Sequence, residues 1–206
     1  MAIEAWDPKS RRWILYQSEA EHSADCQSHP YEKIPRRVFL DTNVVNLLVT
    51  SAEQVFEQAQ ISEEVDNTRA EDIEALMHVF QVGARAQWDL VASQKTIDEI
   101  VLTPNVSDRQ DLLDYALELL QPRDDDCVFA EDFGRRLMGT RFVSALPDLA
   151  DQMLIGNAVG YGCDAFCTRD RRTIVKYRDK LPHLPLRILT PLEWWRCVRP
   201  WAGLFV

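Results

Sequence analysis

The feature that most constrains this chain is the alternation of short, continuous apolar runs with longer stretches whose apolar residues recur at three and four positions. Short continuous runs are typical of strands buried on both faces, and the three-and-four spacing is typical of amphipathic helices. Strands separated by helices predict crossover connections and a mostly parallel sheet. We therefore expect an α/β fold with three layers, α/β/α, around such a sheet. The strand candidates are 38–40, 89–93, 127–129, 165–168 and 186–189.

The helix candidates connect these strands. A helix capped by Thr42 or Asn43 is expected to run to Leu48, and others are expected over 70–88, 96–101 and 107–120. Asp148 is expected to cap a further helix that ends near Gly160, and a terminal helix follows Thr190. The acidic run 124–126 resembles a turn. Residues 1–35 are polar and weakly periodic, so we expect an N-terminal extension over 1–35 and one folded domain over 36–206.

Composition limits the function classes. The 206 residues carry 23 Lys and Arg against 33 Asp and Glu, a formal net charge of -10, so the whole molecule repels nucleic acid and anionic membranes. A polyanionic ligand would have to be held by a local group of cations. No run approaches the roughly 20 apolar residues of a membrane span, and the first 17 residues lack the apolar core of a signal peptide. We expect no membrane partner and a cytoplasmic location, where the five scattered cysteines stay reduced.

Acidic residues follow the ends of the predicted strands. Asp41 ends the first strand, Glu99 lies in the short helix after the second, and Asp170 follows the strand at 165–168. Asp148 and Asp151 lie in the first turn of the helix before that strand. Ligands of parallel sheets bind at the carboxyl ends of the strands, so these groups are expected to meet at one edge.

A fold that gathers carboxylates needs a cation to offset their repulsion. Two carboxylates about 4 Å apart repel by roughly 4 kcal/mol at an effective dielectric constant near 20. Oxygen ligands without His or Cys suit Mg²⁺ or Mn²⁺. Such an ion lowers the pKa of a bound water and neutralises charge on a phosphoryl oxygen, which predicts metal-assisted hydrolysis of a phosphodiester.

Several segments resemble those of PIN-domain nucleases, the group that includes the virulence-associated toxin C ribonucleases. The resemblance lies in VFLDTN at 38–43, SQKTIDEI at 93–100, DLADQMLI at 148–155, FCTRD at 166–170 and ILTP at 188–191. It implies a PIN-like α/β/α fold, a Mg²⁺- or Mn²⁺-dependent endoribonuclease that cuts single-stranded RNA, and a homodimer. It also implies a toxin with an inhibitory antitoxin as its partner. The extension and the 58 positions between Asp41 and Glu99 depart from the family pattern.

The resemblance implies that Asp41, Glu99, Asp151 and Asp170 are the catalytic metal ligands. Each has an alternative that the residue types leave open: Asp41 as a helix cap or strand end, Glu99 on an exposed helix face, and Asp170 in a turn. Asn43 is a candidate outer-sphere residue or a helix-start residue.

Two further groups complete the candidate site. Asp148 is a candidate outer-sphere residue or the N-cap of its helix, with Asp151 as the acidic half of a capping box. Arg169, Arg171 and Arg172 are candidate phosphate-binding residues, because arginine binds phosphate oxygens in a bidentate manner, or else solvated turn residues. Two other functions stay open: a catalytically silent PIN-like interaction module and a structure-specific DNA nuclease.

Overall fold

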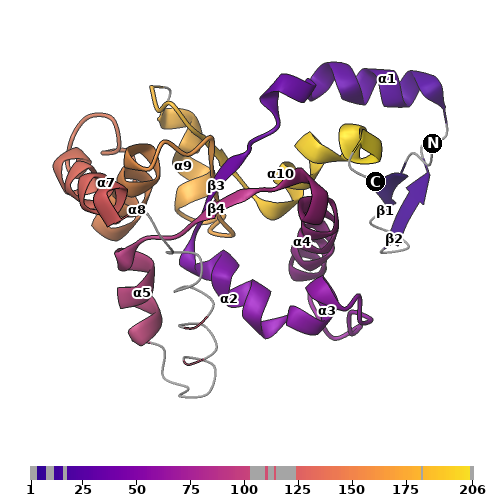
Figure 1. The fold of residues 1–206 in the computed structure, drawn as a ribbon, viewed down its shortest axis with the longest axis horizontal. Coiled ribbons are helices and arrows are strands. Elements are labelled where there is room, and N and C mark those ends of the chain that lie inside the picture. Colours follow the sequence, from indigo (N-terminus) through magenta and orange to yellow (C-terminus); the bar gives the residue numbers. More distant parts are fainter. Residues whose placement is uncertain are drawn as a thin grey trace. The chain divides into compact units, whose positions relative to one another are not determined.

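The fold is described from a computed structural model of the chain (Figure 1). It describes residues 4–7, 12–15, 18–102, 110, 114, 124–181 and 183–204. The chain forms two compact units. The first, here called the sheet unit, consists of Arg36–Thr50 and Asp89–Thr190. The second, here called the helical unit, consists of Met1–Pro35, Ser51–Trp88 and Pro191–Val206.

The sheet unit is built on an all-parallel sheet that has four strands among the described residues, in the order β4-β3-β5-β6. These strands are β3 (Arg37–Leu40), β4 (Asp89–Val91), β5 (Ala165–Cys167) and β6 (Arg187–Leu189). Central β3 pairs with both β4 and β5, with Phe39 opposite Val91 on one side and Phe166 on the other. Val38, Phe39 and Leu40 are fully buried, as the continuous apolar run predicts.

Helices connect the strands of the sheet unit. They are α2 (Thr42–Thr50), α5 (Gln94–Val101), α7 (Asp124–Leu137), α8 (Leu149–Gly160), α9 (Ile174–Tyr177) and the 3₁₀ turn η2 (Arg178–Lys180). Asp148 caps α8 as predicted, because its carboxylate accepts a hydrogen bond from the Ala150 amide at 2.8 Å. The parallel sheet with connecting helices confirms the α/β class and is compatible with three layers.

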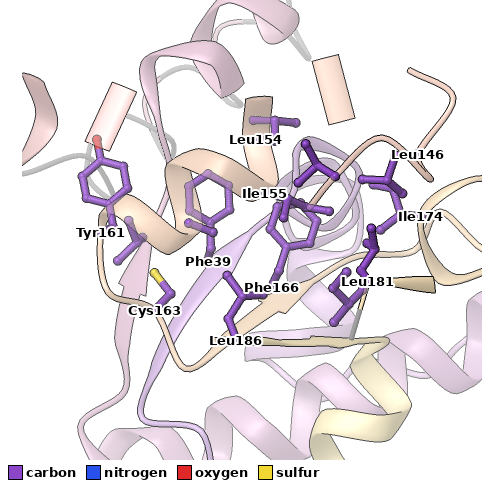
Figure 2. Close-up of a cluster of buried hydrophobic side chains, with 14 of the residues drawn as sticks. Phe39, Leu146, Leu154, Ile155, Tyr161, Cys163, Phe166, Ile174, Leu181 and Leu186 are labelled. Carbon is purple, nitrogen blue, oxygen red and sulfur yellow. The ribbon is translucent and has the colours of Figure 1, made fainter. Parts of the chain in front are cut away.

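The core of the sheet unit lies between β3, β5 and α8 (Figure 2). The rings of Phe39 and Phe166 stack with centroids 5.4 Å apart, and Leu154 and Ile155 of α8 are buried in the same cluster. Burial of each such side chain stabilises the fold by about 1.5–3 kcal/mol. This packing fixes the carboxyl ends of β3 and β5 relative to α8.

Two predictions for the segment before residue 130 are wrong. The predicted strand at 127–129 and the predicted turn at 124–126 both lie in α7. Val128 and Phe129 are 66% and 62% exposed, which a buried strand would not allow. Three apolar residues in a row do not distinguish a strand from a helix, and acidic residues suit the first turn of a helix. The predicted helix over 107–120 lies outside the described ranges.

Glycine allows a close contact between two helices of the sheet unit, α7 and α8. A Cβ added at Gly156 would lie 2.7 Å from Cα of Gly134, and one at Gly160 would lie 2.6 Å from Cα of Ala130. Buried Asn157 reinforces the contact, since its amide can donate to Ala130 O at 3.3 Å and accept from Ser93 Oγ at 3.2 Å. Ser93 precedes α5, so Asn157 ties α8 to the start of α5.

The helical unit contains α1 (Glu19–Ser28), η1 (Tyr31–Lys33), α3 (Ala52–Phe56), α4 (Asn67–Ala86), α10 (Pro191–Val198) and η3 (Arg199–Leu204). Strands β1 (Glu4–Asp7) and β2 (Arg12–Leu15) form an antiparallel pair. In this unit α10 packs on α4, where the rings of His78 and Trp195 stack at 5.0 Å. Asp25 of α1 binds Arg199 of η3 at 2.5 Å, so part of the expected extension pairs with the end of the chain. Among the described helices, none has the length and apolar character to span a membrane.

Candidate functional site

The candidate site is a pocket of about 330 Å³ in the sheet unit, beside the carboxyl ends of the parallel strands. Asp41 directly follows β3, Glu99 lies in α5 after β4, and Asp170 lies in the turn after β5. Asp151 lies in the first turn of α8. The structure therefore brings together the four carboxylates that the sequence places at this edge. The pocket is lined by Asp41, Thr42, Asn43, Asn46, Glu99, Asp151, Leu154, Arg169 and Asp170.

Asp41 is the most deeply buried of the four carboxylates, at 4% exposure. Its Oδ2 accepts hydrogen bonds from Asn43 Nδ2 and from Thr168 Oγ1, both at 2.6 Å. Burial raises the pKa of Asp41 to about 7; the hydrogen bond from Thr168 opposes this rise, and the charges of Glu99 and Asp151 add to it. The three carboxylates are therefore close enough to repel one another.

The helix after β3 differs slightly from the prediction. It begins at Thr42, and the amide of Val45 donates to the backbone oxygen of Asp41 at 3.1 Å. Thr42 and Asn43 thus lie in the first turn, and neither precedes it as a cap. Their side chains instead bind carboxylates of the pocket. Asn43 donates to Asp41, and Thr42 Oγ1 donates to Glu99 Oε2 at 2.5 Å.

Glu99 is held from two sides. Besides the Thr42 hydroxyl on Oε2, Lys95 Nζ lies 3.6 Å from Glu99 Oε1, one helical turn earlier in α5. The helix itself begins with a capping box between Ser93 and Thr96, both of which are buried. The local sequence thus fixes the start of α5, and the tertiary contact with Thr42 directs Glu99 to the pocket.

Asp151 and Asp170 share one hydroxyl group. Thr173 Oγ1 contacts Asp151 Oδ2 at 3.2 Å and also Asp170 Oδ2. The amides of Arg172 and Thr173 donate to Asp170 Oδ1 at 2.9 and 2.8 Å. Burial favours a higher pKa for Asp170, but these hydrogen bonds outweigh it and lower that pKa.

Asp151 lies in a less favourable environment than Asp170. Burial and then the negative charge of Asp148 raise the pKa of Asp151 to about 6, with smaller contributions of the same sign from Asp170 and Glu99. The hydrogen bond from Thr173 acts in the opposite direction. Asp148 itself caps α8 and does not line the pocket, so the structure gives it the cap position and an electrostatic effect on Asp151.

The arginines divide between the pocket and the surface. Arg169 lines the pocket, and its amide donates to Asn43 Oδ1 at 2.8 Å, so Asn43 connects Asp41 to the turn after β5. Arg172 is exposed and Arg171 half-buried, and neither lines the pocket. Of the three candidate phosphate-binding residues, Arg169 is therefore the one that lines the pocket, while the charge of Arg172 helps to lower the pKa of Asp170.

Sequence reasoning missed the threonines and one asparagine. Thr42, Thr168 and Thr173 each bind a site carboxylate, and Asn46 lines the pocket from α2. Thr42 directly follows Asp41 in sequence, and Thr168 ends the predicted strand, so both are near candidate residues. Their hydrogen-bond partners, however, lie 57 and 127 positions away and are set by the fold.

The donor set at this pocket consists of carboxylate, hydroxyl and amide oxygens, with neither His nor Cys in its lining. Within the part of the chain that the structure describes, no three or more His, Cys, Asp or Glu side chains are grouped closely enough to hold a metal ion between them. The carboxylates point instead to hydroxyl and amide donors. Oxygen atoms of these kinds are the ligands that hard cations take in proteins, and here hydrogen bonds hold the carboxylates.

Comparisons with protein-family models, with curated proteins and with solved structures found no match to this chain. The resemblance to PIN-domain nucleases therefore stays a prediction from the sequence.

Proposed function

We propose that this protein is a PIN-like, Mg²⁺- or Mn²⁺-dependent endoribonuclease that hydrolyses RNA phosphodiester bonds at the pocket beside Asp41. The observation that carries the proposal is the meeting of four carboxylates from separate segments in one pocket at the ends of parallel strands. This is the edge at which α/β proteins bind ligands. If the four carboxylates had structural roles alone, they would not need to lie in the same pocket.

The electrostatics of Asp41 supports a cationic ligand. A carboxylate that is buried beside two other carboxylates is unfavourable when ionised, as its pKa of about 7 shows. A divalent cation would favour the ionised form and offset the repulsion. The site thus has an energetic reason to bind a cation near neutral pH.

The ligand types of the pocket, and the absence of a finished group of three among the described residues, suit magnesium better than zinc or calcium. Magnesium is usually held by one or two carboxylates and keeps several waters, with substrate phosphates as further ligands. A finished cage of three protein ligands, which the described residues do not form, is therefore not required. One or two of Asp41, Glu99 and Asp151 would bind the ion directly, and the others, with Asp170, would bind it through its waters.

When bound, such an ion lowers the pKa of water and neutralises charge on a phosphoryl oxygen. The chain's own residues would orient the metal ligands and bind the substrate. The hydroxyls of Thr42 and Thr168 orient Glu99 and Asp41. Arg169, on the pocket wall, would bind a phosphate oxygen of the strand to be cut. Arg169 would supply positive charge locally, although the whole chain has a net charge of -10.

Single-stranded RNA is the proposed substrate. The scissile phosphate must reach the carboxylates of a pocket of about 330 Å³, and a flexible strand meets that constraint better than a stiff duplex. A toxin role with an inhibitory antitoxin, and a homodimer, belong to the same proposal and rest on the sequence resemblance alone.

The test combines cleavage with metal binding. Purified protein is incubated with single-stranded RNA, flap DNA and duplex DNA in Mg²⁺ or Mn²⁺, and Mn²⁺ binding is followed by isothermal titration. We expect the wild-type protein to cleave RNA. Asp41→Asn should lower that activity by at least about 100-fold, because it removes a charge from the ligand set. Asp179→Asn, the same change at an exposed residue of η2, is the control.

Each alternative has its own outcome in this test. Cleavage of flap DNA without cleavage of RNA would replace the proposal by a DNA nuclease. Absence of both cleavage and Mn²⁺ binding would favour a silent interaction module.

A further inference from the structure

Three threonine hydroxyls contact the carboxylates of the pocket, and they differ in what they join. Thr42 and Thr168 each bind one carboxylate. Thr173 contacts two, Asp151 at 3.2 Å and Asp170 at shorter range. Among the described contacts, it is the hydroxyl that links two of the proposed metal ligands directly.

We propose that Thr173 is a positioning residue of this site, whose hydroxyl fixes Asp151 and Asp170 relative to each other. The inference rests on the proposed function, because it concerns how the same carboxylates are held for their ligand. Hydrogen bonds to ligating carboxylates orient them and are worth about 10- to 100-fold in metal affinity or activity.

The geometry leaves the Thr173 hydroxyl free for this role. Thr173 stands immediately before α9 (Ile174–Tyr177), yet its side chain makes no capping hydrogen bond to that helix. A threonine side chain has few allowed positions about its first torsion. In the one adopted here, the hydroxyl oxygen lies against both carboxylates.

The hydrogen bond from the Thr173 hydroxyl matters more for Asp151 than for Asp170. Asp170 is also held by the amides of Arg172 and Thr173, which a side-chain replacement would leave in place. For Asp151, by contrast, the side-chain hydrogen bond given by the described residues is the one from the Thr173 hydroxyl, at 3.2 Å. Asp151 lies on α8 and Thr173 follows β5, so this bond joins two elements across the pocket edge.

Thr173 itself does not line the pocket, so it acts through the carboxylates and not through contact with RNA. Its removal should weaken cation binding and lower the rate of cleavage while leaving RNA binding nearly unchanged. An effect on kcat without an effect on KM separates this role from one in substrate binding.

The experiment compares Thr173→Val, which keeps the shape and removes the hydroxyl, with Thr173→Ser, which keeps the hydroxyl. Isothermal titration with MnCl₂ measures the Kd, and RNA cleavage at fixed Mn²⁺ measures kcat and KM. We expect the valine variant to raise the Kd for Mn²⁺ by about tenfold and lower kcat similarly, with KM within about twofold. The serine variant should stay within about threefold of wild type.

The control is Thr140→Val, the same change in the sheet unit at a hydroxyl that binds Leu137 O at 2.6 Å and not a site carboxylate. Melting of the metal-free proteins checks the fold, and Thr173→Ala is measured alongside in case the valine variant unfolds. Wild-type Mn²⁺ binding in both hydroxyl-less variants would overturn the inference and leave the proposed function standing. A serine variant that binds Mn²⁺ as weakly as the valine variant would also overturn the inference. A wild-type protein that binds no Mn²⁺ and cuts no RNA would overturn both.

Discussion

Asp41 combines the deepest burial in the pocket with two hydrogen bonds to the same oxygen, from Asn43 and Thr168. These bonds hold the carboxylate in place but do not compensate for burial and for the neighbouring charges, so its pKa rises to about 7. At the scale of single residues, the ionised form of Asp41 is therefore unfavourable in the folded protein, a loss of stability of the kind that functional sites often carry.

The sign of this effect on stability follows from the two pKa values. Asp41 changes from 3.8 to about 7 and Asp151 from 3.8 to about 6 on folding, so the folded state binds these protons more tightly than the unfolded chain. Their stabilising contribution is complete below about pH 3.8 and is lost as pH rises, through about 6 for Asp151 and about 7 for Asp41.

Asp41→Asn should therefore stabilise the metal-free protein at alkaline pH. The substitution removes the charge and keeps an acceptor for Asn43 and Thr168, and the change in pKa corresponds to a gain of up to roughly 4 kcal/mol above pH 7. Near pH 4 the gain should be small. Urea unfolding with a chelator present, at about pH 5 and about pH 8, measures it.

Asp179→Asn again serves as the control, since this carboxylate is exposed. An Asp41→Asn variant whose advantage over wild type does not grow between the two pH values would contradict the assignment of the raised pKa to Asp41.

At the scale of elements, the placement of Asp151 depends on how closely α7 and α8 approach. Gly134 and Gly156 face each other across this contact, and Asn157 joins α8 to the start of α5, the helix that carries Glu99. The same contact explains why the segment after residue 124 is a helix: its small residues fit the surface of α8, which a three-residue apolar run does not reveal.

Gly156→Ala should destabilise the protein, although alanine normally favours a helix over glycine by about 1 kcal/mol. The new Cβ would lie 2.7 Å from Cα of Gly134, so the two helices must separate. Overpacking of this kind costs about 1–3 kcal/mol. Denaturant unfolding measures the loss, and titration with Mn²⁺ shows whether the shift of α8 also weakens the site.

Gly139→Ala is the matched control for this change. Its added Cβ would meet no neighbouring atom, but its φ of 70° makes alanine strained by about 1 kcal/mol. A Gly156→Ala variant more stable than wild type would show that the two helices do not pack backbone to backbone.

At the scale of the whole molecule, the chain passes between its two compact units at residues 35–36, 50–51, 88–89 and 190–191. Among the described residues, every one that lines the pocket belongs to the sheet unit. The segment 1–35 belongs to the helical unit, where Asp25 binds Arg199 and the Trp201 indole donates to His29 O at 2.7 Å.

Removal of residues 1–33 should therefore lower the melting temperature and spare the metal site. The truncation removes the Asp25 carboxylate that binds Arg199, and loss of a mostly buried ion pair costs a few kcal/mol, or roughly 5 °C or more in a protein of this size. Calorimetry measures the melting temperature, and isothermal titration measures Mn²⁺ binding.

The full-length variant Asp25→Asn removes the same ion pair without shortening the chain. A truncated protein that stays folded but no longer binds Mn²⁺ would show that the sheet unit depends on the segment 1–33 for its site.

The sequence alone was sufficient for those features that depend on local order. The run before Asp41 predicted β3, because continuous burial on both faces requires continuous apolar residues. Asp148 predicted the start of α8, because a cap acts on amides two residues away. The meeting of Asp41, Glu99, Asp151 and Asp170 followed from parallel topology, which places the ends of successive strands at one edge.

Only the tertiary structure decided which partner each of these side chains has. The bonds from Thr168 to Asp41 and from Thr173 to Asp151 join residues 127 and 22 positions apart, and no local pattern encodes them. The same holds for α7, whose helical state reflects close packing on α8, and for Asp25, whose partner Arg199 lies 174 positions away. Periodicity reports how a segment buries its own surface, whereas hydrogen-bond partners are chosen when distant segments pack together.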